Sequence, residues 1–280
     1  NSRQQIVIPW MTTHMIGSMQ LALGVTAFLI TLGLTPVVRL VAIRRGWVAR
    51  PREDRWHKKT TALLGGIAIF LGIGLSIAIG YEGLGGLRDI ALFGNGKPDV
   101  PLWLAVFSGA SILFLLGLTD DFINLKPQTR LIGQITVASA VIFLGFRLNW
   151  FTSLTLDTMV TLIWIVGITN AFNLLDNMDG LCAGVAMVAS LSLALLYGST
   201  HPAACMLALI VAGACAGFLI YNFNPASIFM GDCGSLVIGF CIAVVSLQYG
   251  TLNTGDSISS LAVPLLILMV PILDTTLVTT

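Results

Sequence analysis

Charged residues are scarce in this chain. They make up 10% of its 280 residues, and hydrophobic residues make up 56%, whereas a soluble domain is about 25% charged. Several apolar runs reach the roughly 20 residues that a membrane helix needs. Strands of alternating polarity, the signature of a membrane β-barrel, are absent. The composition excludes a soluble fold and predicts an all-α, polytopic bundle of membrane helices.

Other signals are missing as well. The five cysteines are odd in number and follow no metal-binding spacing, so we interpret them as small buried hydrophobes. The net charge of +1 indicates no nucleic-acid partner. Without an internal repeat, a low-complexity tract or a cleavable signal peptide, residues 1–280 are interpreted as a single membrane-embedded domain. Because the residues from Leu273 to Thr280 stop inside an apolar segment, we expect the domain to be truncated at its C-terminus.

Lys and Arg are distributed unevenly between the loops. Ten of the 14 basic residues fall at or after the first apolar segment and in the loop that holds Lys126 and Arg130. Basic loops face the cytoplasm, so with nine spans the acidic loops at 119–129, 173–180 and 222–234 face it too. We therefore predict a multi-pass protein of the inner (plasma) membrane with a polar site on its cytoplasmic face. The nine segments lie at about 17–43, 62–80, 102–118, 130–147, 157–172, 181–198, 204–221, 235–251 and 259–279.

A pair of adjacent carboxylates, Asp120 and Asp121, ends the third apolar segment. Carboxylates at a hydrocarbon boundary are costly. Two of them repel by about 4 kcal/mol at ~4 Å under an effective dielectric constant near 20. The alternative is a helix end that faces water, but acids are disfavoured at helix C-termini. A divalent cation or a basic partner would relieve the repulsion.

A second island is rich in both amides and carboxylates. Asn173, Asp176 and Asp179 are three residues apart, so on a helical turn they face the same way. Oxygen ligands of this kind suit Mg²⁺ or Mn²⁺. The alternative is a turn that is rich in Asn and Asp because these residues form turns.

The third island surrounds Asp232, which lies between glycines where a ligand can approach the backbone closely. Phe229, three residues earlier, is either a surface on which a base stacks or a core aromatic. In the basic loop, His57 stands beside two lysines and serves either to neutralise phosphate or only to set topology. Asp274, in the last apolar segment, is either functional or bonded within the bundle.

Carboxylates, amides and a basic loop at a membrane surface suggest metal-assisted chemistry on a phosphate, with a lipid substrate. Phosphoryl transfer depends on positioning and charge neutralisation more than on covalent machinery. An ion-coupled transporter would also explain carboxylates in a membrane protein. Transporter carboxylates, however, belong near the middle of the bilayer, whereas these lie at segment ends.

Three ordered motifs resemble those of the polyprenyl-phosphate N-acetylhexosamine-1-phosphate transferases, a superfamily of membrane enzymes. The resemblance covers about residues 17–280 and is nearest to the bacterial undecaprenyl-phosphate GlcNAc-1-phosphate transferases. It implies that a polyprenyl phosphate attacks a UDP-N-acetylhexosamine and that UMP leaves, with Mg²⁺ (or Mn²⁺) required. The motifs are Asp120-Asp121-Phe122 with Lys126, the run from Asn170 to Leu181, and the run from Asn222 to Ser235.

The resemblance also implies roles for individual residues. Asp232 matches the principal metal ligand, with Asn173 as its helper, and Asp120 and Asp121 match the acidic pair that handles the acceptor phosphate as base or nucleophile. The catalytic set is then Asp120, Asp121 and Asp232. The substrate-binding set is Lys126 for the acceptor phosphate, Asn170, Asp176 and Asp179 for the donor, Phe229 for stacking on uracil, and His57.

The chain departs from the family pattern at a few positions. Ala49 stands where Asp is common and Thr61 where Pro is common, and Asn177 and Cys233 replace Gly and Thr. The family has an Arg- and His-rich loop after the ninth span, which supports the expectation of a further C-terminal part. We expect UDP-GlcNAc and undecaprenyl phosphate as substrates, and the start of a cell-envelope glycan such as lipopolysaccharide or teichoic acid. The phospho-N-acetylmuramoyl-pentapeptide transferases are the alternative branch, and a homodimer is compatible with this interpretation.

Overall fold

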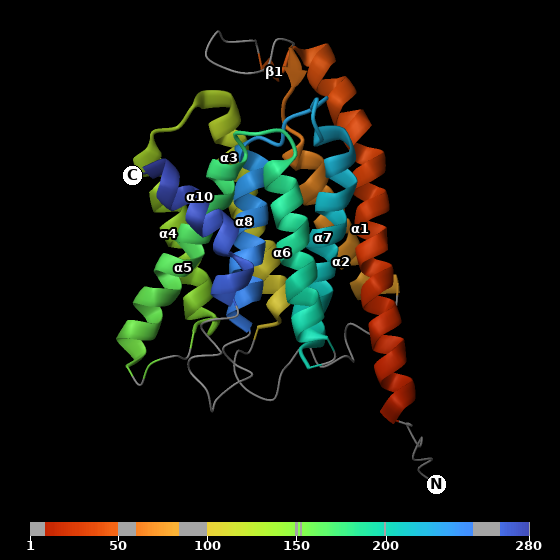
Figure 1. Cartoon of the computed structure of the whole chain (residues 1–280), viewed down its shortest axis with the longest axis vertical. Helices are drawn as coiled ribbons and strands as arrows, with labels where there is room; N and C mark the ends of the chain where they lie inside the picture. The colour runs from red at the N-terminus through yellow and green to blue at the C-terminus, as the bar shows by residue number, and fades with distance from the viewer. Residues whose placement is uncertain are drawn as a thin grey trace.

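The computed structural model describes residues 9–49, 60–83, 100–148, 151, 153–198, 200–248 and 264–279. Each of the nine predicted apolar segments overlaps one helix of this structure, so the all-α prediction is confirmed. The helices form one bundle, shown in Figure 1. They are α1 (Pro9–Arg45), α2 (Gly66–Gly83), α3 (Leu102–Ile123), α4 (Pro127–Phe143), α5 (Leu154–Leu175), α6 (Leu181–Tyr197), α7 (Pro202–Asn222), α8 (Asp232–Leu247) and α10 (Met269–Thr279).

Helix length and apolarity support a membrane protein. Within the described ranges, four helices are long and apolar enough to cross a bilayer: Gly17–Arg45, Leu102–Ile123, Leu154–Leu175 and Pro202–Asn222. The apolar helices Gly66–Tyr81, Leu181–Tyr197 and Asp232–Leu247 are shorter. The total of nine spans therefore stays a prediction.

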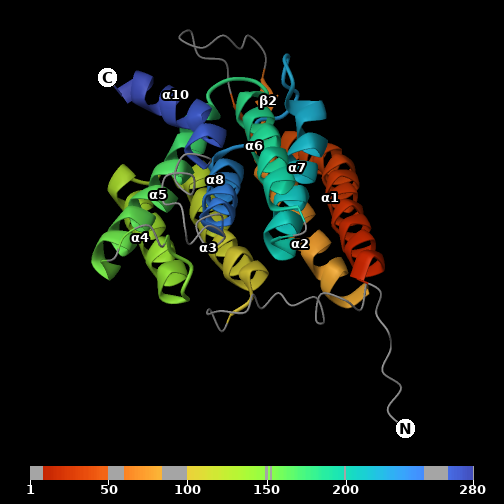
Figure 2. The same ribbon diagram turned by 60° about the horizontal axis from the view of Figure 1, so that its bottom comes forward.

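Helix α8 is the centre of the bundle. All of its residues from Cys233 to Leu247 are buried, as expected for a helix that is apolar on every side. It packs mainly against α3 and α5, while α1 packs mainly against α7 and α2. The two views in Figures 1 and 2 place α8 between the α3–α5 side and the α6–α7 side. Any group at the start of α8 is thereby held from several directions.

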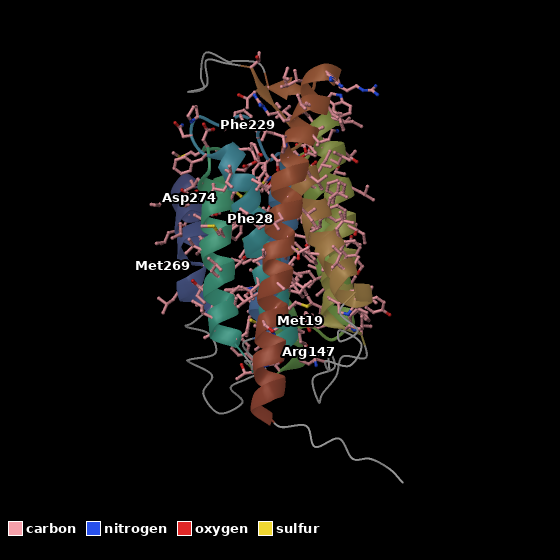
Figure 3. All side chains as sticks on the ribbon, turned by 90° about the vertical axis from the view of Figure 1, so that its right-hand side faces the viewer. Met19, Phe28, Arg147, Phe229, Met269 and Asp274 are labelled. Atoms are coloured by element: carbon pink, nitrogen blue, oxygen red, sulfur yellow. The ribbon has the colours of Figure 1, made fainter. Side chains whose placement is uncertain are left out.

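A short extended layer closes one end of the bundle. Strand β1 (Val48–Ala49) pairs antiparallel with β2 (Thr61–Ala62). The loop before α8 continues this layer, because the Phe229 amide donates to the Ala62 carbonyl at 2.8 Å and the Phe229 carbonyl accepts from the Gly65 amide at 2.9 Å. Phe229 lies at this end and Arg147 at the opposite end in Figure 3.

A glycine brings α3 against the start of α8. A Cβ atom added at Gly117 would lie 2.5 Å from the carbonyl oxygen of Asp232 and 2.6 Å from the amide nitrogen of Cys233. Real Cβ atoms do not approach backbone this closely, so α3 contacts α8 backbone to backbone. The position of Asp232 therefore depends on the absence of a side chain at Gly117.

We expect Gly117→Ala to destabilise the protein by about 1 to 3 kcal/mol, since the added methyl group overpacks a rigid backbone contact. The measurement is thermal unfolding of the purified protein in detergent. The matched control is Gly33→Ala on α1, where an added Cβ meets nothing within 4 Å and alanine favours the helix. Equal unfolding temperatures for the two variants would contradict the close contact.

Candidate active site

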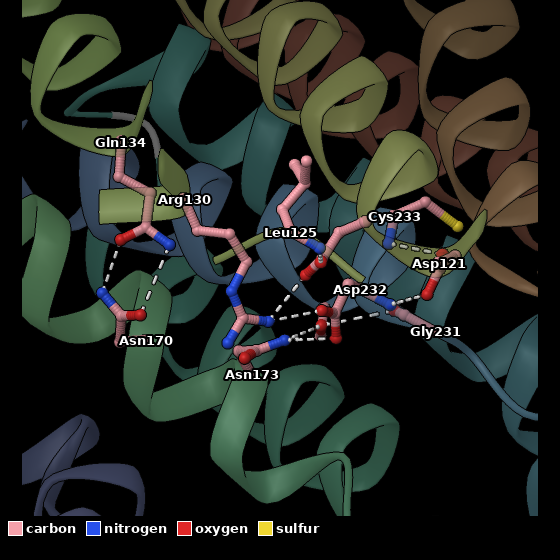
Figure 4. Close-up of polar contacts among 11 residues, drawn as sticks. Asp121, Leu125, Arg130, Gln134, Asn170, Asn173, Gly231, Asp232 and Cys233 are labelled. Atoms are coloured by element: carbon pink, nitrogen blue, oxygen red, sulfur yellow. Dashed lines mark hydrogen bonds and ion pairs between the residues drawn. The ribbon is translucent and has the colours of Figure 1, made fainter. Parts of the chain in front are cut away.

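Two carboxylates at the start of α8 and the end of α3 share one guanidinium group. Arg130 Nη1 donates to Asp120 Oδ2 at 2.7 Å and to Asp232 Oδ2 at 2.6 Å. The side chain of Asp120 is 6% exposed, and those of Arg130 and Asp232 are 30% and 29% exposed. Figure 4 shows Arg130 from α4 and Asp232 from α8 pointing toward one another. At this degree of burial, removing one partner of an ion pair leaves the other charge uncompensated, which destabilises the protein.

The other oxygen of each carboxylate is also bound. Asp120 Oδ1 accepts the Leu125 amide at 2.6 Å, and Asp232 Oδ1 accepts Asn173 Nδ2 at 2.8 Å. The same Asn173 nitrogen donates to Ser235 Oγ at 2.9 Å. The predicted metal ligand and its predicted helper are thus in direct contact, although they are 59 residues apart in the chain.

Asp121 faces a different target from its neighbour. Its Oδ1 accepts the Asp232 amide at 2.8 Å and its Oδ2 accepts the Cys233 amide at 3.1 Å. The carboxylate thus lies on the first turn of α8, whereas Asp120 faces Arg130. Adjacent residues of a helix diverge by about 100°, so the two aspartates have different surroundings.

Asp176 follows directly after α5 and is half-buried. Burial raises its pKa well above the usual range, and the negative charges of Asp232 and Asp121 raise the pKa further. A hydrogen bond with the Gly231 backbone acts in the opposite direction. The Asp176 carboxyl therefore lies close enough to Asp232 and Asp121 to interact with both.

Asp179 and Asn170 have partners within the bundle. Asp179 Oδ2 accepts Asn224 Nδ2 at 3.2 Å and the Ala226 amide at 3.0 Å, so Asp179 holds the loop that leads to α8. Asn170 Nδ2 donates to Gln134 Oε1 at 2.5 Å. Both residues lie near the site, and both also have a part in its architecture.

The remaining predicted residues lie at the edge of this network or outside the described part. Lys126 is exposed and directly precedes α4, next to the amide that binds Asp120. Phe229 is half-buried in the loop that pairs with β2, and Asp274 is half-buried on α10. His57 lies outside the described residues.

Sequence reasoning missed Arg130 and Gln134. Arg130 was counted only as a sign of membrane topology, and Gln134 was not considered. Their spacing carried a signal, because polar residues four apart in an otherwise apolar helix share one face. Arg130 contacts Asp120 and Asp232 from that face, and Gln134 contacts Asn170.

The donor set fits a divalent cation of the magnesium type. Within the described ranges, no three His, Cys, Asp or Glu side chains form a ready-made metal cluster. Two carboxylates and an amide do meet here, and one guanidinium already lies between the carboxylates. Mg²⁺ takes one or two protein carboxylates and completes its shell with water and substrate phosphate. Asp232, Asp120 and the oxygen of a rotated Asn173 amide could hold such an ion.

An apolar cavity of about 260 Å³ opens between α5 and α10. Its wall includes Ala171, which lies between Asn170 and Asn173 in the sequence, so the cavity extends toward the polar site. Its lining residues are Val160, Ile163, Trp164, Gly167, Ile168, Ala171, Ile272, Thr275 and Thr276.

Comparison with known proteins identifies relatives over most of the chain. A probable undecaprenyl-phosphate N-acetylglucosaminyl 1-phosphate transferase of Bacillus subtilis is 33% identical, covering 90% of this chain and 68% of the relative. A decaprenyl-phosphate N-acetylglucosaminephosphotransferase of Mycolicibacterium smegmatis is 32% identical over 91% of this chain and 68% of the relative. A phospho-N-acetylmuramoyl-pentapeptide-transferase of Oceanobacillus iheyensis is 33% identical over 80% of this chain and 73% of the relative.

The family model described as glycosyl transferase family 4 matches residues 103–250, which include the acidic pair, the amide-rich island and Asp232. The resemblance drawn from the three motifs is therefore confirmed. This chain belongs to glycosyl transferase family 4.

Proposed function

We propose that this enzyme transfers GlcNAc-1-phosphate from UDP-GlcNAc to undecaprenyl phosphate and releases UMP, with Mg²⁺ as its metal. The observation that carries the proposal is the meeting of Asp120 and Asp232 on the guanidinium of Arg130, with Asn173 bound to Asp232, at the end of an apolar bundle. Such a site concentrates charge where a lipid phosphate and a sugar diphosphate would meet. The names of the relatives from Bacillus subtilis and Mycolicibacterium smegmatis support the same donor and acceptor classes.

The reaction requires an in-line displacement at phosphorus. A phosphate oxygen of the acceptor attacks the β-phosphorus of the donor. The bond from that phosphorus to the oxygen bridging the α-phosphate breaks, and UMP leaves with that oxygen. A bound Mg²⁺ supplies charge neutralisation on the donor diphosphate. The enzyme's own residues must then orient the two phosphates and keep them from repelling one another.

Arg130 is suited to hold a phosphate. Both of its contacts with Asp120 and Asp232 use Nη1. The guanidinium has five N–H donors in a planar fork that matches phosphate geometry, so Nη2 and Nε can face a substrate oxygen. Exposed Lys126, at the edge of the network, adds positive charge there. Asp120 lies next to this phosphate position and helps to orient the guanidinium that binds the phosphate.

The apolar cavity suits the hydrocarbon chain of the acceptor. It lies between α5 and α10, and α5 also carries Asn170 and Asn173. A lipid lying there would bring its phosphate to the polar end of α5. In this proposal the nine segments cross the inner membrane, the polar end faces the cytoplasm, and the product starts a cell-envelope glycan.

An ion-coupled transporter is disfavoured by where the carboxylates lie. Asp120 is in the last turn of α3, Asp176 follows the end of α5, and Asp232 begins α8. A transport site belongs near the bilayer midplane. A homodimer stays a prediction.

Asp232→Asn should lower UMP release from UDP-GlcNAc, undecaprenyl phosphate and Mg²⁺ by about 100-fold or more, because the main ligand of the metal is lost. A coupled assay for UMP on the full-length protein measures this. The control is Asp157→Asn, a buried carboxylate at the other end of α5 that accepts the Phe151 amide. Robust activity of the Asp232 variant would refute the metal role.

Arg130→Gln should raise the KM for undecaprenyl phosphate and lower kcat. The phosphate would lose the planar N–H donors of the guanidinium, and Asp120 and Asp232 would lose their shared cation. Arg130→Lys should retain part of the activity, since it keeps the charge and loses the planar geometry. Steady-state kinetics with each substrate varied in turn measure both effects. Wild-type constants in both variants would remove Arg130 from the site.

A donor screen separates the two branches of the family. With undecaprenyl phosphate as acceptor, we expect mass spectrometry to detect undecaprenyl diphosphate linked to GlcNAc. A lipid product formed only from UDP-N-acetylmuramoyl-pentapeptide would contradict the proposed donor and favour the branch represented by the relative from Oceanobacillus iheyensis.

A further inference from the structure

Helix α8 begins without a cap of its own. Its N-cap residue is Gly231, which has no side chain and has φ 77° and ψ 170°. The first four amides of a helix have no partner within the helix, and an unpaired amide at a buried helix end is costly. Cys233, Gly234 and Ser235 are all buried, so the first turn of α8 requires hydrogen-bond acceptors from the protein.

The structure provides acceptors for the amides of Asp232, Cys233, Gly234 and Ser235. The carbonyl of Gly231 accepts the amides of Gly234 at 3.0 Å and Ser235 at 3.1 Å. The amides of Asp232 and Cys233 donate to Asp121, one to each carboxylate oxygen, at 2.8 Å and 3.1 Å. The cap therefore comes from α3, 111 residues earlier in the chain.

A local cap is excluded by geometry. A positive φ strains any residue with a side chain. A Cβ atom at Gly231 would also lie 2.8 Å from Asp121 Oδ2 and 2.9 Å from Oδ1. The residue that normally caps a helix must be glycine here, and the cap must come from another helix. A carboxylate at this place is additionally favoured by the positive end of the helix dipole.

We propose that Asp121 is a positioning residue that caps α8 and so fixes the backbone of Asp232, and that it takes no proton in the reaction. Asp232 then presents its carboxylate to Arg130 and Asn173. The two members of the acidic pair divide their work, since Asp120 faces the shared guanidinium and Asp121 faces main-chain amides. The effect on the reaction rests on the proposed function, whereas the cap itself does not.

Hydrogen exchange of single amides tests the cap without any substrate. In the full-length protein in lipid nanodiscs, Asp121→Ala should accelerate exchange of the Asp232 and Cys233 amides by about tenfold, as expected for loss of a helix cap. Asp121→Asn keeps one acceptor oxygen and should give a smaller acceleration. Asp120→Asn is the matched control and should leave both amides protected. Unchanged exchange in both Asp121 variants overturns the proposal, and the isosteric Asn variant carries the test if the Ala variant does not fold.

Kinetics then distinguish a positioning residue from a base. A displaced Asp232 weakens metal binding, so Asp121→Asn should raise the Mg²⁺ concentration for half-maximal UMP release several-fold and recover activity at high Mg²⁺. Its activity should exceed that of Asp121→Ala. An equal loss of kcat in both variants at every Mg²⁺ concentration would indicate a base and overturn the proposal. If the wild-type protein releases no UMP but shows the predicted exchange pattern, the result contradicts the proposed function and supports the cap.

Discussion

The ion network of Asp120, Arg130 and Asp232 is the interaction on which the polar end of this bundle depends. It joins α3, α4 and α8 through a single nitrogen atom, Nη1 of Arg130. Two carboxylates this close repel one another, so the shared guanidinium stabilises the meeting of the helix ends that carry them. In the proposed function the same balance favours a bound metal ion, because the negative charge here exceeds what one guanidinium neutralises. Stability and chemistry therefore rest on the same balance of charge.

The sequence was sufficient for the helices and for the polar islands, but not for the contacts between them. Long apolar runs predict membrane helices because the bilayer leaves few other solutions for the backbone. Arg130 was missed because a basic residue near the end of a membrane helix is already explained as a signal of membrane topology. Its partner Asp232 is also 102 residues away in the chain. Asp121 looked equivalent to Asp120 because the two are adjacent in the sequence. On a helix, however, adjacent side chains point in different directions. Only the docking of α8 against α3 shows that one carboxylate meets a guanidinium and the other meets amides.

Residues of the three motifs also hold the loops that form the site. Asp179 binds the backbone of Ala226, and Asn222 links the Gly180 amide to the Ile228 carbonyl. Phe229 is fixed through its main chain to β2 and to the residue before α2. Motif residues in such a site serve two purposes, since a substrate contact is reproducible only when its loop has one conformation. For this reason the sequence could indicate the polar islands that contribute to the site, but not which of their residues would contact a ligand.

The position of the site at the end of an apolar bundle has a physical consequence for a lipid substrate. Helix α5 lines an apolar cavity along part of its length and carries Asn170 and Asn173 near its end. A hydrocarbon chain gains by remaining in apolar surroundings, while a phosphate gains by reaching cations and amides. Because α5 carries both the apolar cavity wall and the polar amides, the distance between these two surfaces is fixed. The position of the hydrocarbon chain along α5 would therefore determine where the phosphate of the acceptor lies. In the proposed reaction the start of α8, which α3 holds in place, would then set the position of the second phosphate.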